Sequence, residues 1–149
     1  MSDFVDFIIK PFCPKGYVIA QRASQMPRLA YLRLSLAELK EKIVLLKISE
    51  HEDLTHGIVI VNNSKIRNKN LCGSQPVDSF LKNPAEIPIE WHGKKILFLG
   101  TFFEKEPKFD YVYMFVSCLY EDDGVWTRKM VTLNRSFDPK VYVVAALKN

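Results

Sequence analysis

Two histidines in the segment His51-Glu-Asp-Leu-Thr-His56 could, by residue type, bind a metal ion. The segment resembles the His-Glu-x-x-His pattern of zinc proteases, but its histidines are five residues apart instead of four. On a helix, that spacing turns the two side chains about 140° apart, so they could not bind one ion from one face. We therefore interpret the segment as polar surface and predict neither a metal nor another cofactor.

The adjacent carboxylates of Asp122 and Asp123 are candidates for acid–base chemistry, but they precede Gly124 between two apolar stretches. Asp and Gly in this position are typical of a hairpin turn, which is solvated, whereas a general acid needs burial. The chain also lacks a Gly-x-Ser-x-Gly nucleophile motif and a phosphate-binding glycine loop. A hydrolase that assembles a Cys–His pair or a carboxylate site only in three dimensions stays open as a third hypothesis.

The three cysteines, Cys13, Cys72 and Cys118, are odd in number and widely spaced. The chain begins with an acidic segment that lacks the basic start of a secretory signal, and it contains no apolar run of about 20 residues. These features predict reduced thiols in a cytoplasmic protein without a membrane span, and leave export by a non-classical route open. Cys118 lies in an apolar stretch and is expected in the core.

A basic segment, residues 62–70, is the first candidate binding site. It is rich in Asn, it contains Lys65, Arg67 and Lys69, and no acidic residue occurs between Asp53 and Asp78. If the segment is an extended loop, the three cations project to one side and can contact phosphates of RNA or single-stranded DNA. A solvated loop without a ligand explains the same composition.

Aromatic residues form the second candidate site. The chain contains 10 Phe, 6 Tyr and 2 Trp, and the C-terminal third is the richest part. Most aromatics of a small β protein belong to the core, and no RNP motif of RNA-binding sheets occurs. Any that share an exposed hairpin face would suit a protein partner, because Tyr, Trp and Arg dominate interface energetics. The predicted partner surface contains Tyr111, Tyr113, Tyr120, Trp126 and Arg128.

The strongest structural prediction is the element that carries those aromatics. Residues 111–120 and 125–133 are rich in β-branched and aromatic residues and flank the acidic turn, which predicts an antiparallel hairpin. A three-residue turn would place Tyr120 opposite Trp126, and a four-residue turn would place Leu119 there. The sequence does not choose between these registers, which present different faces.

The main helix is predicted to begin after Ser35, because Ser35-Leu-Ala-Glu38 is a capping box. We expect it to continue to about residue 48, although Ile43 to Ile48 could instead form a strand. A second capping box, Ser49 to Glu52, predicts a short helix ended by Gly57. Residues 57–61 are then expected as a strand, residues 62–70 as a loop and residues 76–81 as a helical turn.

Further strands are predicted from β-branched and aromatic runs. Residues 87–91 and 94–99 are expected to pair as a hairpin, with a bulge at Gly100 and continuation through residue 103. The remaining predicted strands are residues 17–21, 29–34 and 141–147, and residues 4–10 are either a strand or one helical turn.

These elements predict one α+β domain over residues 1–149: a mainly antiparallel sheet, or a small partly open β-barrel, of about five or six strands with one main helix and one or two short ones. The leading functional hypothesis is a non-enzymatic binding or adaptor module that contacts a protein through the hairpin. The alternative is nucleic-acid binding through the basic segment beside the sheet.

Overall fold

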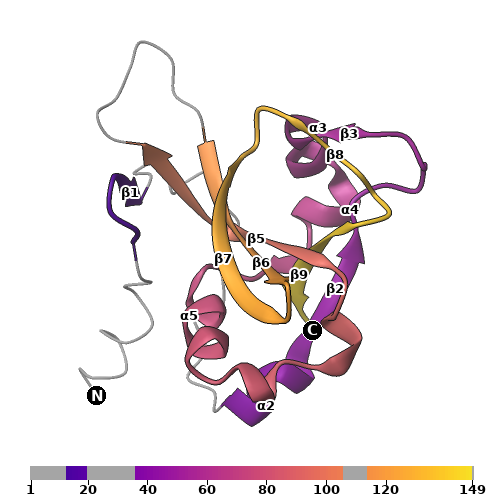
Figure 1. Ribbon diagram of the computed structural model, residues 1–149. Helices are drawn as coiled ribbons and strands as arrows, with labels where there is room; N and C mark the ends of the chain where they lie inside the picture. The colour runs from indigo at the N-terminus through magenta and orange to yellow at the C-terminus, as the bar shows by residue number, and fades with distance from the viewer. Residues whose placement is uncertain (1–12, 20–35, 106–113, 149) are drawn as a thin grey trace.

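The computed structural model describes residues 13–19, 36–105 and 114–148. The predicted α+β class is confirmed: the strands form an open, mixed and mainly antiparallel sheet of seven strands (Figure 1). Its central order is β2-β9-β5-β6-β7, with β1 paired to β5 and β4 paired to β9. The strands are β1 Tyr17–Ile19, β2 Ile43–Lys47, β4 Asn70–Leu71, β5 Lys95–Lys105, β6 Met114–Asp122, β7 Val125–Thr132 and β9 Tyr142–Leu147; β3 Thr55–His56 and β8 Ser136–Phe137 form a separate pair.

Helices cover both faces of this sheet. They are α2 Leu36–Lys42, α3 Gly57–Asn62, α4 Ser64–Arg67 and α5 Gln75–Lys82, with 3₁₀ turns η2 Pro84–Glu86 and η3 Ile89–Trp91. Figure 1 shows α2 and α5 grouped together and well separated from α3 and α4. We call one side the α5 face, where Phe80 belongs to a core cluster with Phe98 and Leu119. The other side is the α3 face, where Ile60 and Ile66 belong to the second core cluster.

The helix predicted over residues 36–48 is shorter than expected. It ends at Lys42, and Ile43–Lys47 is strand β2, paired antiparallel with β9. The run Ile-Val-Leu-Leu is apolar all round, and a strand buries both of its faces: Ile43 joins the core of the α5 face, while Val44 packs against that of the α3 face. Pairing with β9 therefore overrides helix propensity.

The hairpin is confirmed, but its turn has only two residues. Asp123 and Gly124 have φ angles of 53° and 82°, as a type I′ turn requires. Glu121 consequently lies opposite Trp126, and both registers predicted from the sequence are wrong. An Asp-Gly dipeptide favours this turn because its twist matches that of the flanking strands.

The predicted hairpin at residues 87–99 is wrong in its first arm. Residues 89–91 form the turn η3, and Trp91 packs in the core as a helical residue. The second arm is β5, which runs through Gly100 with the predicted irregularity of register between Phe98 and Phe103. Gly100 allows β5 to lie close to the backbone at Cys72, because a Cβ at Gly100 would lie 2.6 Å from the Cys72 carbonyl carbon.

Residues 49–67 differ most from the prediction. No helix forms over Ser49–Glu52, and the predicted strand 57–61 is helix α3. The His56 side chain caps α3 by accepting a hydrogen bond from the Ile58 amide. Gly57 is the first residue of α3, and it lies so close to Leu133 that a Cβ on it would be 2.1 Å from the Leu133 carbonyl oxygen. The predicted loop 62–70 contains α4, because Ile66 is buried in the core of the α3 face.

Other predictions agree with the structure. Helix α5 and strand β9 form where expected, and β1 covers the part of predicted strand 17–21 that the structure describes. The elements predicted at residues 4–10 and 29–34 lie outside the described residues. Within the described ranges, no helix is both long enough and apolar enough to cross a bilayer.

Candidate functional site

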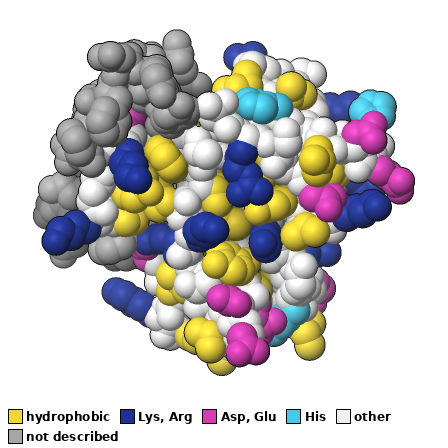
Figure 2. Space-filling model, turned by 45° about the horizontal axis from the view of Figure 1, so that its top comes forward, with side chains coloured by type: hydrophobic (Ala, Val, Ile, Leu, Met, Phe, Trp, Pro, Cys, Tyr) yellow, Lys and Arg dark blue, Asp and Glu magenta, His cyan; other side chains and the backbone are white. Residues whose placement is uncertain are grey.

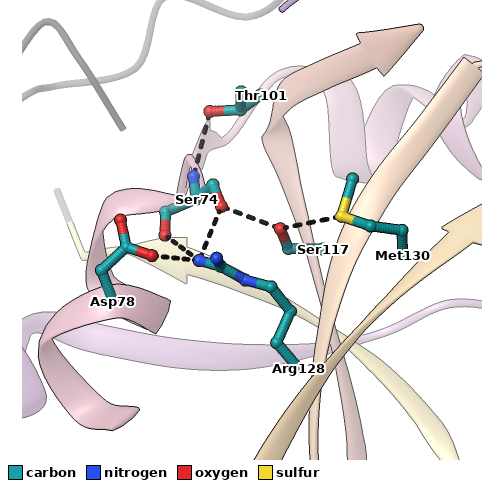
Figure 3. A network of polar contacts seen from close by, with 6 residues as sticks. All are labelled: Ser74, Asp78, Thr101, Ser117, Arg128 and Met130. Atoms are coloured by element: carbon teal, nitrogen blue, oxygen red, sulfur yellow. Dashed lines mark hydrogen bonds and ion pairs between the residues drawn. The ribbon is translucent and has the colours of Figure 1, made fainter. Parts of the chain in front are cut away.

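Arg128, predicted as a partner-binding residue, is instead part of a polar network on the α5 face (Figure 3). Its guanidinium pairs with the Asp78 carboxylate of α5 and donates to the Ser74 hydroxyl at 3.3 Å. The Ser74 hydroxyl lies 2.8 Å from that of Ser117 on β6, and the Ser74 amide donates to Thr101 on β5. Only 9% of the Arg128 side chain is exposed. The network ties α5 to the sheet and leaves Arg128 little surface for a partner.

The other predicted partner residues do not form one patch. Tyr120 and Trp126 are both partly buried, but Tyr120 packs against the core of the α3 face and Trp126 against that of the α5 face. The two-residue turn causes this separation, because it pairs Trp126 with Glu121 and not with Tyr120. Tyr111 and Tyr113 lie outside the described residues.

Cations and aromatic rings meet on the α3 face. The ammonium of Lys95, at the start of β5, lies 5.4 Å from the centre of the Tyr120 ring and 5.6 Å from that of Tyr142. The guanidinium of Arg135 lies 4.8 Å from the centre of the Phe137 ring and 5.6 Å from that of Tyr142. All four distances are within the range of cation–π attraction. Strand β5, strand β9 and the segment before β8 therefore bring two cations to one aromatic cluster.

A third cation, Lys129, lies near Lys95 and Arg135, close to the buried thiol of Cys118. Burial raises the pKa of this thiol from 9.0 to about 12, while the nearby charges of Lys95, Arg135 and Lys129 lower it. Lys129 lies directly across from Cys118 in the hairpin and is exposed. Among the described residues, none of these three cations forms an ion pair with a carboxylate. We call Lys95, Lys129, Arg135, Tyr120 and Tyr142 the basic–aromatic cluster.

Figure 2 shows Lys and Arg side chains interspersed with hydrophobic ones across the middle of one face. Asp and Glu side chains gather instead toward the right and the bottom of that view. A positively charged surface with hydrophobic side chains between its charges suits an anionic ligand that also carries flat apolar groups.

The predicted anion-binding residues lie in a different place, beside the edge strand β2. A groove of about 620 Å³ is lined there by Lys65 and Lys69 together with Lys47 of β2, but not by Arg67. The expected extended loop would have aligned Lys65, Arg67 and Lys69, whereas on α4 residues two apart point to nearly opposite sides. The remaining lining residues are Leu45, Leu46, Ser49, Glu50, Asn63, Ser64, Ile66 and Asn68.

The groups proposed for catalysis or metal binding do not converge. His56 caps α3, and His92 contacts Glu121 at 3.1 Å on the surface. Burial raises the pKa of Cys72, like that of Cys118, to about 12, so neither is a thiolate at neutral pH. Over residues 13–19, 36–105 and 114–148, no group of three metal-binding side chains occurs. Asp122 and Asp123 lie at the exposed hairpin turn.

No protein-family model, curated protein or solved structure matches the chain. Sequence reasoning did not select Lys95, Lys129, Arg135 or Tyr142. The Asp-Gly turn contained a signal for part of the cluster, since the register it sets places Lys129 and Tyr120 on one face. Nothing local indicated that Lys95 and Arg135 would join them.

Proposed function

We propose that the protein binds single-stranded nucleic acid on the α3 face, with the basic–aromatic cluster as the contact surface. The observation that carries this proposal is the placement of Lys95 and Arg135 against tyrosine rings, with Lys129 beside them. The site differs from the one the sequence predicted for this function, because Lys65 of α4 and Lys69 line the separate groove beside β2.

The chemistry of the cluster fits both parts of a nucleotide. Ammonium and guanidinium groups attract phosphates, and a partly exposed Tyr120 ring can stack on a base once Lys95 moves from the ring to a phosphate. Tyr142 is only 7% exposed, so its ring supports the cations and does not stack. Three phosphate contacts are few, and we expect weak binding with little sequence preference.

The test is fluorescence anisotropy of labelled oligo(dT) and oligo(rU) titrated with the full chain over a range of salt. Three contacts predict a slope of about −2 for the logarithm of the association constant against the logarithm of salt concentration. The double substitution Lys129→Ala and Arg135→Ala should remove most of this slope. The matched control is Lys82→Ala, an exposed lysine in the last turn of α5 on the other face. Binding independent of salt, or equally reduced by the control, rejects the proposal.

A second candidate function is the protein-binding module, for which the end of the hairpin provides an observation. Val125 is 66% exposed, and the neighbouring Trp126 ring packs edge-on against His92 at 5.2 Å. Ile89, in the turn that leads to His92, is 78% exposed. Acidic Glu90, Asp122 and Asp123 surround these groups in the sequence, which suits a partner with apolar and basic side chains.

This second candidate is tested with the same chain immobilised. If it holds, Val125→Asp together with Ile89→Asp should abolish capture of a protein partner from lysate, whereas Val59→Asp, an exposed apolar residue of α3, should not. Equal capture by both variants would contradict a partner site at the hairpin end.

A further inference from the structure

We propose that the open edge of β2 binds an extended acidic peptide as an additional strand of the sheet. This site is separate from the basic–aromatic cluster. β2 is the last strand in the order β2-β9-β5-β6-β7, and within the described residues it pairs only with β9 (Figure 1). An edge strand presents backbone groups to which an extended segment can pair.

The register identifies which backbone groups face outward. The Lys148 amide donates to the Lys42 carbonyl at 2.7 Å, so Lys42 and Lys148 are opposite residues whose backbone groups point toward each other. Such pairs alternate along an antiparallel ladder, so Val44 and Leu46 also point their backbone groups to β9. The N–H and C=O groups of Ile43, Leu45 and Lys47 consequently point away from the sheet.

The groove beside β2 provides the space and the charge for a ligand. It lies between Leu45–Lys47 and the segment Asn63–Lys69, and its volume of about 620 Å³ is within the usual range for binding pockets. Three lysines and one carboxylate, Glu50, line it. Leu45, Leu46 and Ile66 contribute apolar surface to its wall.

This combination favours a peptide with acidic side chains over other anions. Backbone N–H and C=O groups alternate along the edge and match another polypeptide, whereas a nucleic acid strand has no complementary ladder of donors and acceptors. Lys47 on the edge repels another basic strand and, as a charge on a short edge strand, disfavours edge-to-edge pairing with a second copy. Glutamate or aspartate in the incoming strand turns that repulsion into attraction.

The first test uses a fluorescein-labelled peptide of about eight alternating Val and Glu residues, titrated with the full chain and followed by fluorescence polarisation. Lys47→Glu combined with Lys69→Glu should weaken binding by about tenfold or more, because it places carboxylates opposite carboxylates. The matched control is Arg67→Glu, since Arg67 is an exposed cation of α4 that does not line the groove, and it should change affinity by less than about twofold.

The second test needs no protein variant. Two versions of the peptide are N-methylated at alternate residues, one on each edge of the strand. Strand addition predicts that one version loses binding and the other retains it, because only one edge of the peptide pairs with β2. Equal binding of both versions would show that charge alone holds the peptide and would overturn the proposal. Binding of an oligonucleotide, but not the peptide, that depends on Lys47 and Lys69 would overturn it as well.

Discussion

Two consecutive cations of β7, Arg128 and Lys129, have opposite surroundings. The strand turns Arg128 to the α5 face, where the side chain is 9% exposed and pairs with Asp78, and turns Lys129 to the α3 face, where it is exposed. The Arg128 guanidinium contacts three oxygen atoms, the carbonyl and hydroxyl oxygens of Ser74 and a carboxylate oxygen of Asp78. Lys129, by contrast, has no ion pair among the described residues. A cation on a strand therefore stabilises the fold or remains available to a ligand according to which face of the sheet its register selects.

The largest effect is expected from Arg128→Ala. This substitution leaves the Asp78 carboxylate and the Ser74 hydroxyl without the guanidinium, and it opens space between α5 and the hairpin. Because Asp78 is 26% exposed and water replaces part of the lost interaction, we expect a loss of about 2 kcal/mol in the free energy of unfolding. Urea denaturation measures it.

The matched substitution is Lys129→Ala, which should change the free energy of unfolding by less than about 0.5 kcal/mol. Equal effects of the two substitutions would contradict the division of roles between the two faces.

A second prediction concerns the two buried thiols: Cys72 lies in the core of the α5 face and Cys118 in the core of the α3 face. Burial raises the pKa of Cys72 and Cys118 from 9.0 to about 12, so the folded state holds protons that the unfolded state releases above pH 9. This contribution to stability is complete below pH 9 and is lost as pH rises from about 9 toward 12. Each thiol lowers the free energy of unfolding by about 1.4 kcal/mol per pH unit in that range.

The effect of the thiols is separated from that of other groups by comparison with Cys72→Ala. The stability of this variant should fall less steeply between pH 9 and 10 than that of the parent chain, because one of the two titrating thiols is gone. Parallel pH profiles of the two proteins would refute the assignment of this effect to Cys72.

A smaller effect is expected from removing one cation of the basic–aromatic cluster. Arg135→Ala should weaken oligonucleotide binding by about three- to fivefold at low salt and reduce the salt slope by about 0.7, because one phosphate contact is lost. Arg135 is exposed, and among the described residues its Nε donates only to the Ser136 carbonyl at 3.3 Å, so stability should change little. An unchanged salt slope would remove Arg135 from the interface.

Much of the fold could be predicted from local patterns. The hairpin, α5, β9 and the beginning of α2 all have a turn, a cap or a β-rich run that favours one structure. The end of α2 and the strand predicted over 57–61 failed for the opposite reason. Ile43–Lys47 and Gly57–Val61 are both short apolar runs, and pairing with β9 makes one a strand, while capping and burial of Ile60 make the other a helix.

The candidate sites were harder to predict because their members come from distant parts of the chain. Lys65 and Lys69 are neighbours in the basic segment that the sequence singles out, but Lys47 joins them only because β2 and α4 border one groove. Lys95 and Arg135 are brought to the same tyrosine by the pairing of β5 with β9 and by the segment that leads to β8. Local sequence contains no signal for such contacts.

The measurement that tests the central proposal most directly is an NMR titration of ¹⁵N-labelled protein with unlabelled oligo(dT). If nucleic acid binds the basic–aromatic cluster, the amides of Lys95, Tyr120, Lys129 and Arg135 should shift together and in a salt-dependent way, while those of α5 should stay in place. Shifts centred on α5 and Trp126, or none at any oligonucleotide concentration, would contradict it.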